Sequence, residues 1–150
     1  PFRSIRAEQN RATTGNFAKM KGNLNWPVQG RVTGKFGRTR NPDTGVVIEN
    51  VGIDIRATSG ARVQSVLDGV VSTVTYIRGH GNIIIIDHGG GFSTVYAQVD
   101  NISVHENEYI QMGNTIASVA VPEKNTKAMF HFEIWGNQKK LNPEHWLIRR

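Results

Sequence analysis

A segment near the C-terminal end of the chain alternates apolar and polar side chains over eight residues, from Ala128 to Trp135. A period of two is typical of a β-strand with one buried face, because successive side chains point to opposite sides of the strand. Phe130, Phe132 and Ile134 fall on one side, which we predict to be the core face. The opposite face carries Met129, His131, Glu133 and Trp135. A histidine, a carboxylate and an indole together make that face the first candidate for function.

Other apolar runs predict a β-rich fold with many turns. The four isoleucines at 83–86 are apolar on both faces and predict a central strand. Asp68-Gly69 is a favoured tight-turn dipeptide and predicts a hairpin of residues 62–67 and 70–77. Asn142-Pro143 predicts a capped helical turn. Further strands, bounded by glycine turns, are expected at residues 30–37, 46–48, 92–98 and 115–121.

Two of the expected strands place polar residues on one face. In a strand over residues 50–55, Asn50 and Asp54 share one side, and Val51 lies on the other. In the strand over residues 92–98, Tyr96 and Gln98 share a side. An acid between two isoleucines is common on the outer face of a half-buried strand, so Asp54 alone is weak evidence for a functional site.

Charge divides the chain into two parts. The net charge is +6, but residues 1–40 hold nine Lys and Arg against one acid, whereas residues 41–150 hold nine against eleven. We therefore expect a basic N-terminal arm over residues 1–25, with helical stretches at 5–9 and 16–20, and a single domain over residues 26–150 that begins at Trp26-Pro27. A basic arm suits a polyanion such as nucleic acid, anionic lipid or wall polymer, but a solvated surface is a better explanation than any single one of these partners.

Several classes of protein are excluded or disfavoured by composition. No apolar run reaches the length of a membrane span, and the absence of cysteine excludes disulfides and thiolate metal sites. The glycine loops lack the spacing and the lysine of a phosphate-binding loop. Because the chain begins at Pro1 without a signal-like segment, we expect it to be a fragment whose targeting sequence lies upstream.

The motifs together resemble the LytM (lysostaphin-type, M23) zinc peptidase family. The resemblance covers about residues 26–147, in order, and implies a single, mainly β, antiparallel sandwich-like domain of the duplicated hybrid type after a short helical or irregular N-terminal arm. It rests on Gly52-Ile53-Asp54-Ile55, Asp68-Gly69-Val70-Val71, Gly81-Asn82, Asp87-His88-Gly89, Ser93-Thr94-Val95-Tyr96-Ala97, His131-Phe132-Glu133 and Asn142-Pro143.

The resemblance also implies that the zinc site is lost. Active members bind zinc through an H-x-x-x-D pair and the second His of H-x-H, and of these Asp54 and His131 remain. Asn50 stands at the first ligand position, and an amide is a poor zinc ligand. Gln98 and Met129 stand where two histidines assist proton transfer, which neither side chain can perform. We therefore predict no cofactor, no catalytic residue and no enzymatic activity.

The chain also resembles the EnvC-type LytM domains that activate cell-wall amidases, including the junction at residues 17–28. This resemblance implies a non-catalytic domain of the periplasm or cell envelope that activates an N-acetylmuramoyl-L-alanine amidase in cell division and binds no nucleic acid. Its upstream region would belong to a membrane division complex. The former active-site cleft would bind the amidase through Asn50, Val51, Asp54, Tyr96, Gln98, Met129, His131 and Trp135.

Two alternatives remain open from the sequence. A peptidoglycan-binding scaffold would use the same groove together with the basic arm. An active metallo-endopeptidase would use an unusual ligand set that includes Asp54 and His131. Tyr96, Trp135 and Met129 offer large apolar contacts to a protein partner, and this favours the activator.

Overall fold

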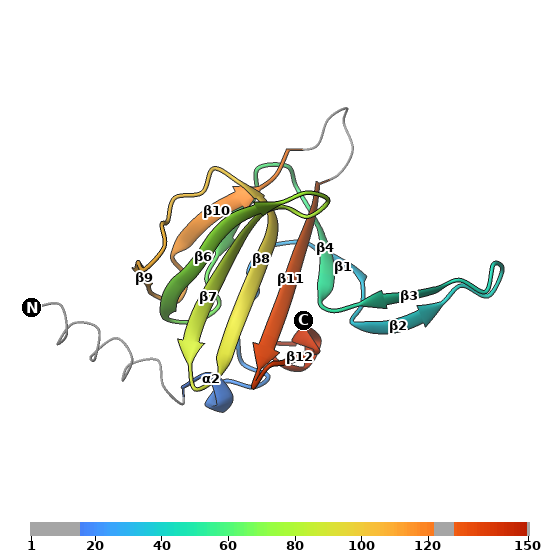
Figure 1. Ribbon diagram of the computed structural model, residues 1–150, viewed down its shortest axis with the longest axis horizontal. Helices are drawn as coiled ribbons and strands as arrows, with labels where there is room; N and C mark the ends of the chain where they lie inside the picture. The colour runs from blue at the N-terminus through green and yellow to red at the C-terminus, as the bar shows by residue number, and fades with distance from the viewer. Residues whose placement is uncertain (1–15, 122–127, 150) are drawn as a thin grey trace, which may run out of the picture.

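The computed structural model describes residues 16–121 and 128–149, and these fold mainly into antiparallel β-strands (Figure 1). A short helix, α2 (Asn16–Lys19), comes before the strands, and a 3₁₀ turn, η1 (Pro143–His145), follows them. The strands in chain order are β1 (Arg31–Gly34), β2 (Gly37–Arg40), β3 (Val47–Asn50), β4 (Ile53–Ala57), β5 (Arg62–Gln64), β6 (Gly69–Ile77), β7 (Gly81–Gly89), β8 (Phe92–Asp100), β9 (Tyr109–Ile110), β10 (Thr115–Val119), β11 (Ala128–Gly136) and β12 (Lys139–Leu141).

One large sheet organises the described part of the chain. Its order is β1-β4-β11-β8-β7-β6-β9, with β10 joined to β8 and β5, and β12 joined to β11. Every pair in it is antiparallel. Strands β2 and β3 form a separate two-stranded hairpin that projects from the side of the molecule (Figure 1). The predicted mainly β, antiparallel fold class is confirmed.

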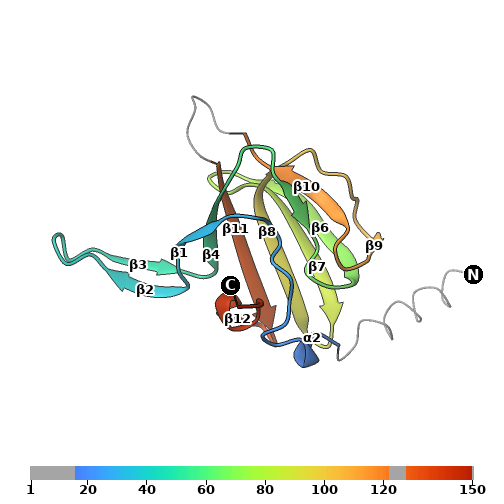
Figure 2. The same cartoon turned by 180° about the vertical axis from the view of Figure 1, so that it is seen from behind.

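The core lies between this sheet and the segments that cross behind it. Phe130, Phe132 and Ile134 of β11 are fully buried, which confirms the predicted core face. Ile84 of β7 is also fully buried, as expected for a central strand. From behind, residues 20–30 and β10 run across the sheet (Figure 2). Their apolar side chains close the core with those of β5: Leu24, Val28, Val63, Ile116 and Val119.

The packed body begins earlier than the predicted boundary at residue 26. Phe17 of α2 is fully buried, and its ring stacks on that of Phe92 at 4.8 Å and lies 5.2 Å from that of Trp146. Leu24 is fully buried and pairs with Leu147 in a parallel bridge. The last part of the predicted arm is therefore part of the core. The expected helix at 16–20 is present as α2, whereas the one at 5–9 lies outside the described residues.

One further prediction of local structure is wrong, and one strand was not predicted. Residues 62–67 and 70–77 do not form a hairpin, because β5 pairs with β10 and β6 pairs with β7 and β9. Between them Ser65 donates its backbone N–H to Asn114 O, which directs the chain toward β10. In addition, β12 adds a strand to β11 that the alternation did not predict. The capped turn is confirmed, since Asn142 Oδ1 accepts the N–H of Glu144.

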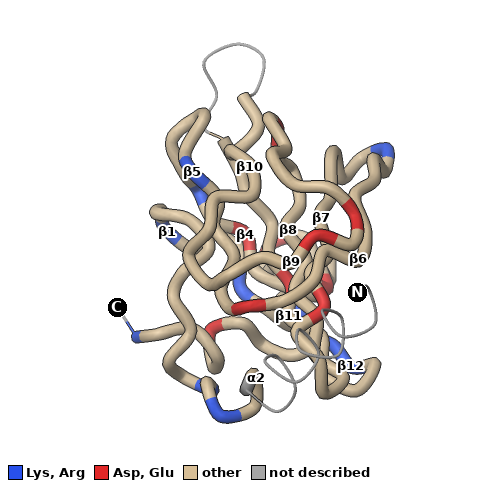
Figure 3. Tube along the Cα trace, turned by 90° about the vertical axis from the view of Figure 1, so that its left-hand side faces the viewer, with Lys and Arg blue, Asp and Glu red and all other residues tan. Residues whose placement is uncertain are grey.

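Lys and Arg do not gather in one patch on the described part of the chain. Figure 3 shows them spread over α2, β1, β5 and β12, whereas acidic residues gather around β6 and β9. Residues 16–40 carry six of the nine Lys and Arg of residues 1–40 and no acid, so most of the basic excess lies on described residues. Within the described ranges, every helix falls short of the length and apolar character that a membrane span requires.

His88, near the end of β7, lies in the core. Its side chain is fully buried, with Nδ1 2.7 Å from Asp68 O and Nε2 2.7 Å from Thr94 Oγ1. Nδ1 donates to the carbonyl, so Nε2 accepts from the hydroxyl and the imidazole is neutral. Burial, which the nearby acids and the Asp68 carbonyl only partly offset, lowers the pKa of His88 to about 4.

This buried histidine predicts a loss of stability in mild acid. The unfolded chain takes up a proton near pH 6.5 and the folded chain only near pH 4, so stability falls as the pH drops between these values. From pH 6.5 to pH 5 we expect His88 to remove about 1.5 kcal/mol from the free energy of unfolding. Urea titrations of the wild-type chain and of His88→Gln measure the difference in slope. An NMR titration of the His88 ring with a midpoint near pH 6.5 would contradict the prediction.

Candidate functional site

A row of polar side chains crosses the face of the sheet opposite the core. We call the row Asn50, Asp54, His131, Glu133 and Trp135 the polar row. Its centre is set by strand register, because β11 pairs with β4 such that His131 stands directly opposite Asp54. On its other side β11 pairs with β8, where Ala97 is opposite His131. Alternation along β11 then places Glu133 and Trp135 on the same face.

Two glycines make room for this register. A side chain on Gly34 would place its Cβ 2.4 Å from Asp54 Oδ2, and a Cβ on Gly52 would lie 2.2 Å from the carbonyl oxygen of Phe132. Both positions therefore allow β1 and the β3–β4 bend to approach the row closely. The bend itself was not predicted, since a single strand was expected over residues 50–55. The half-buried Val51 lies in this bend.

His131 is bonded at both ring nitrogens. Nδ1 lies 2.9 Å from Asp54 Oδ1, and Nε2 lies 2.9 Å from Glu133 Oε2. Burial disfavours the charged ring, but the hydrogen bonds to the two carboxylates outweigh it and raise the pKa of His131 to about 9. At neutral pH both nitrogens therefore donate protons, and neither has a free lone pair.

The Asn50 side chain is oriented by two hydrogen bonds. Its Oδ1 accepts the backbone N–H of Gly52 at 3.2 Å, and its Nδ2 donates to Asp54 Oδ2 at 3.0 Å. The amide thus presents its NH₂ group to Asp54, and an NH₂ group has no lone pair for a metal. With His131 on Oδ1 and Asn50 on Oδ2, both oxygens of Asp54 accept a hydrogen bond.

The other end of the row is formed by Glu133 and Trp135. Trp135 Nε1 donates to Glu133 Oε1 at 2.7 Å. Burial alone would raise the pKa of Glu133, but the hydrogen bonds from His131 and Trp135 outweigh it and hold that pKa below its usual value. The Lys140 ammonium on β12 lies 4.9 Å from the centroid of the Trp135 ring, a cation–π contact. Sequence reasoning placed Glu133 on this face without assigning it to the site, and it missed Lys140.

The polar row does not fit a zinc ion. A zinc site needs three or four ligand atoms that converge on one point at about 2.0–2.3 Å. Asp54 and Glu133 lie instead at opposite nitrogens of the His131 ring, so no single point is near all three. No group of three or more His, Cys, Asp or Glu residues suited to a metal occurs within residues 16–121 and 128–149. The donors and acceptors of the row satisfy one another.

Gln98 and Met129 lie together at one end of the row, beside a hollow of about 350 Å³. Gln98 has a φ of 62° and is the extra residue of a β-bulge, because Asn82 pairs with Val99 and Ile83 pairs with Ala97. Met129 is 38% exposed, and its sulfur accepts a hydrogen bond from Thr33 Oγ1 at 3.8 Å. Neither side chain has a group that exchanges protons near neutral pH.

The same bulge separates Tyr96 from Gln98, contrary to the prediction that they share a side. Tyr96 is fully buried, and its hydroxyl accepts the backbone N–H of Val66 at 3.1 Å and lies 2.9 Å from Thr94 Oγ1. Its ring packs 5.3 Å from that of Phe132. The structure therefore places Tyr96 in the core and not on the surface with the other predicted site residues.

A second hollow of about 290 Å³ lies at the Trp135 end of the row. Its lining is mostly apolar, with Ile85 and Val95 from the neighbouring strands and two polar side chains, Ser93 and Gln138. Ile83, Val95 and Ala97 form a small apolar cluster on this face, against which Ile85 and Trp135 pack. We call the surface from the hollow beside Met129 to the hollow beside Trp135 the cleft. The cleft offers apolar contacts at both ends. Between them lies the polar row, which we call saturated because its donors and acceptors are hydrogen-bonded to one another.

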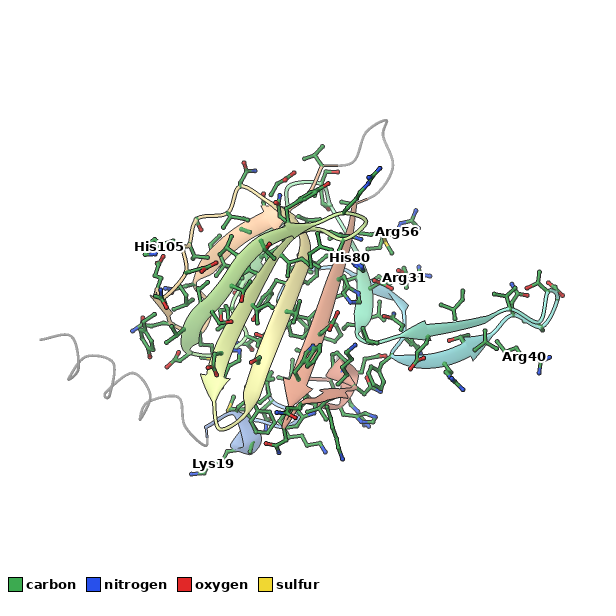
Figure 4. The ribbon with its side chains drawn as sticks, viewed as in Figure 1. Lys19, Arg31, Arg40, Arg56, His80 and His105 are labelled. Carbon is green, nitrogen blue, oxygen red and sulfur yellow. The ribbon has the colours of Figure 1, made fainter. Side chains whose placement is uncertain are left out.

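The other histidines do not join the polar row. His105 lies at the β9 side of the molecule, where it contacts Glu108 at 3.4 Å (Figure 4). His145 belongs to η1, and His88 is buried in the core.

Comparison with known proteins identifies relatives that match most of this chain. The murein hydrolase activator NlpD of Escherichia coli K12 is 32% identical over 126 residues, which cover 83% of this chain and 31% of that protein. The murein hydrolase activator EnvC of the same strain is 26% identical over 136 residues, 91% of this chain and 32% of that protein. This chain thus spans about a third of the length of these relatives.

The fold is also that of solved structures. A zinc-containing peptidase from Vibrio cholerae superimposes with a TM-score of 0.72 at 27% identity, covering 86% of this chain and 41% of that one. The sequence of residues 49–143, which contains the polar row and most of the sheet, matches Peptidase family M23. The chain therefore belongs to peptidase family M23, as its LytM-like motifs indicated, and its relatives include proteins named murein hydrolase activators.

Proposed function

We propose that this chain is a non-catalytic LytM domain that binds and activates a cell-wall N-acetylmuramoyl-L-alanine amidase, and so promotes peptidoglycan hydrolysis during cell division. The observation that carries the proposal is the saturated polar row. At the positions where the family binds zinc, Asn50 and His131 both donate to Asp54, and the second nitrogen of His131 donates to Glu133. Metal binding would require these hydrogen bonds to break.

The lack of proton-transferring groups supports the same proposal. In the mechanism implied by the family, two histidines assist the attack of water on a peptide bond, and Gln98 and Met129 occupy those positions. No other histidine of the described residues is bonded to the row, since its members contact one another, Gly52 and Lys140. The cleft therefore has binding chemistry and no hydrolytic chemistry.

The surface of the cleft suits a protein partner. Trp135 and Met129 are partly exposed apolar side chains, each beside a hollow that can accept an apolar side chain of the partner. The carboxylates of Asp54 and Glu133 lie between them, and Asn50 and Gln98 add further hydrogen-bonding groups. Exposed tryptophan and methionine side chains beside hydrogen-bonding groups are typical of protein–protein interfaces.

We also propose where the domain acts and to which complex it is joined. The similarity to NlpD and EnvC over nearly the whole chain supports a place in the bacterial periplasm or cell envelope. There an upstream region would join the domain to a membrane division complex. The test is the degradation of labelled peptidoglycan by a purified amidase with and without this chain: faster degradation supports the proposal, and an unchanged rate contradicts it.

A second candidate is a peptidoglycan-binding scaffold. The observation that favours it is the hollow beside Trp135, where an indole adjoins Ser93 and Gln138, because aromatic rings with nearby hydrogen-bonding groups suit sugars. This candidate predicts that the chain sediments with isolated sacculi in the absence of an amidase. Binding would weaken with salt, because the first 40 residues carry a large basic excess.

A further inference from the structure

The β2–β3 hairpin is a projection whose apolar side chains serve no internal purpose. Strands β2 and β3 pair with each other and with no other described strand, and the hairpin extends away from the sheet beyond β4 (Figures 1 and 2). Val46, Val47 and Ile48 are 55%, 54% and 62% exposed. Exposed aliphatic side chains on a projecting element mark a candidate contact surface, because water solvates them poorly, and the face on which each one lies decides which of them a partner can reach.

The two faces of the hairpin differ in chemistry. Residues directly opposite each other share a face, and the pairs are Gly37 with Asn50, Thr39 with Ile48, Arg38 with Glu49 and Arg40 with Val47. By alternation, the first two pairs lie on one face and the last two on the other. The ion pair between Arg38 and Glu49, with N and O 3.9 Å apart, agrees with this assignment. Arg40 also belongs to this charged face (Figure 4).

The uncharged face of the hairpin is continuous with the cleft. Asn50 is the last residue of β3, and its side chain donates to Asp54 in the polar row. Ile48 and Thr39 follow Asn50 on the same face, farther from the sheet. A molecule that lies in the cleft and extends past Asn50 therefore meets Ile48 and Thr39 first, and it does not meet the Arg38–Glu49 ion pair.

The size of the cleft indicates that a protein partner must extend past it. Strands β8, β11 and β4 are spaced about 4.8 Å apart, and the stretch from Met129 to Trp135 is about 20 Å long, which gives roughly 300 Å². A stable protein–protein interface needs about 800 Å² from each partner. The cleft alone provides less than this, and the uncharged face of the hairpin adds exposed apolar surface next to it at Asn50.

We propose that the face of the β2–β3 hairpin carrying Thr39 and Ile48 is a second contact surface for the amidase that occupies the cleft. The inference rests on the proposed function, and it adds a contact between the amidase and the hairpin, outside the cleft. Ile48 packs against apolar side chains of the amidase, and the charged face with Arg38, Arg40 and Glu49 stays in water.

Two neighbouring residues provide a matched test. Ile48→Asp and Val47→Asp place the same charge at adjacent positions of similar exposure but on opposite faces, and both positions are too exposed for the change to unfold the domain. The measurement is the Kd of each variant for the purified N-acetylmuramoyl-L-alanine amidases of the source bacterium, by titration calorimetry. We expect Ile48→Asp to weaken binding about tenfold or more and Val47→Asp to change it less than about twofold.

The outcomes separate this inference from the proposed function. If Trp135→Ala weakens binding while Ile48→Asp does not, the hairpin contact is wrong and the amidase partner stands. An equal loss in Ile48→Asp and Val47→Asp also overturns the inference, because it would reflect charge and not a particular face. If the wild-type chain binds none of the amidases, the proposed function fails, and the hairpin contact fails with it.

Discussion

Trp135→Ala is expected to remove most of the amidase stimulation, lowering the stimulated rate toward that of the amidase alone. The indole lines the hollow of about 290 Å³ at one end of the cleft and is fixed by its hydrogen bond to Glu133 and by the Lys140 ammonium. A held, partly exposed tryptophan beside a hollow is the residue type that contributes most to binding, at about 2–4 kcal/mol when truncated. That corresponds to a loss of affinity of about 30-fold to 1,000-fold.

The control for Trp135→Ala is Tyr109→Ala. Tyr109 is an aromatic residue with a hydrogen bond to Asp68, but it lies on β9 at the far edge of the sheet. The two variants are compared in dye release from labelled sacculi at limiting chain concentration, and their folding is checked by thermal unfolding. Equal stimulation by Trp135→Ala and the wild-type chain would contradict the proposal that the amidase binds in the cleft. Tyr96→Ala cannot serve here, because Tyr96 is fully buried and its truncation would destabilise the core.

Asn50→His is expected to restore zinc binding without restoring hydrolysis. The substitution removes the amide that donates to Asp54. It supplies an imidazole nitrogen as a third zinc ligand beside Asp54 and His131. We expect zinc affinity to rise on the order of 100-fold or more, since three ligands are the usual minimum for a zinc site with one open position. His131 must release a proton and turn from Glu133, so the gain should increase with pH.

The measurement is metal content after equilibrium dialysis against micromolar zinc, with Asn50→Ala as the control that removes the amide and adds no ligand. The wild-type chain and Asn50→Ala should retain much less than one zinc per chain. Asn50→His should still release no dye from sacculi, because Gln98 and Met129 remain. Stoichiometric zinc on the wild-type chain would contradict the saturated polar row, and hydrolysis by Asn50→His would contradict the roles given to Gln98 and Met129.

The alternation of β11 was sufficient to predict both faces of that strand. Phe130, Phe132 and Ile134 are buried, and His131 and Glu133 lie together on the other side. The pattern succeeds here because β11 is long, regular and central, so each side chain meets the environment that its position in the period dictates. Glu133 belonged to the candidate face from the start, but its role became clear only from its hydrogen bond to His131.

Local patterns failed where pairing between distant segments decided the structure. Tyr96 and Gln98 are two residues apart, and regular alternation would place them on the same face. The bulge in β8 at Gln98 breaks this alternation, so Tyr96 lies in the core and Gln98 does not. Asp68-Gly69 has the composition of a tight hairpin turn, but β5 instead joins β10. Bulges and strand partners depend on residues far apart in the sequence, so a short window does not contain the information.

Lys140 could not be found from the sequence for a similar reason. It contacts Trp135 through β12, a three-residue strand that pairs with the end of β11 and has no alternation long enough to detect. The link between Asn50 and Asp54 was easier to anticipate, because their spacing matches the H-x-x-x-D pattern of the family. The structure adds that the two side chains satisfy each other across a bend, not along a continuous strand.

The most direct test of the central claim is dye release from labelled sacculi in three mixtures: the chain alone, a purified N-acetylmuramoyl-L-alanine amidase of the same bacterium alone, and the two together. A domain that docks an amidase in its cleft and has no hydrolytic chemistry predicts little release from either protein alone and strong release from the pair. Release by the chain alone at a rate comparable to that of the pair would contradict this account, because a hydrolytic site would then survive despite Asn50, Gln98 and Met129.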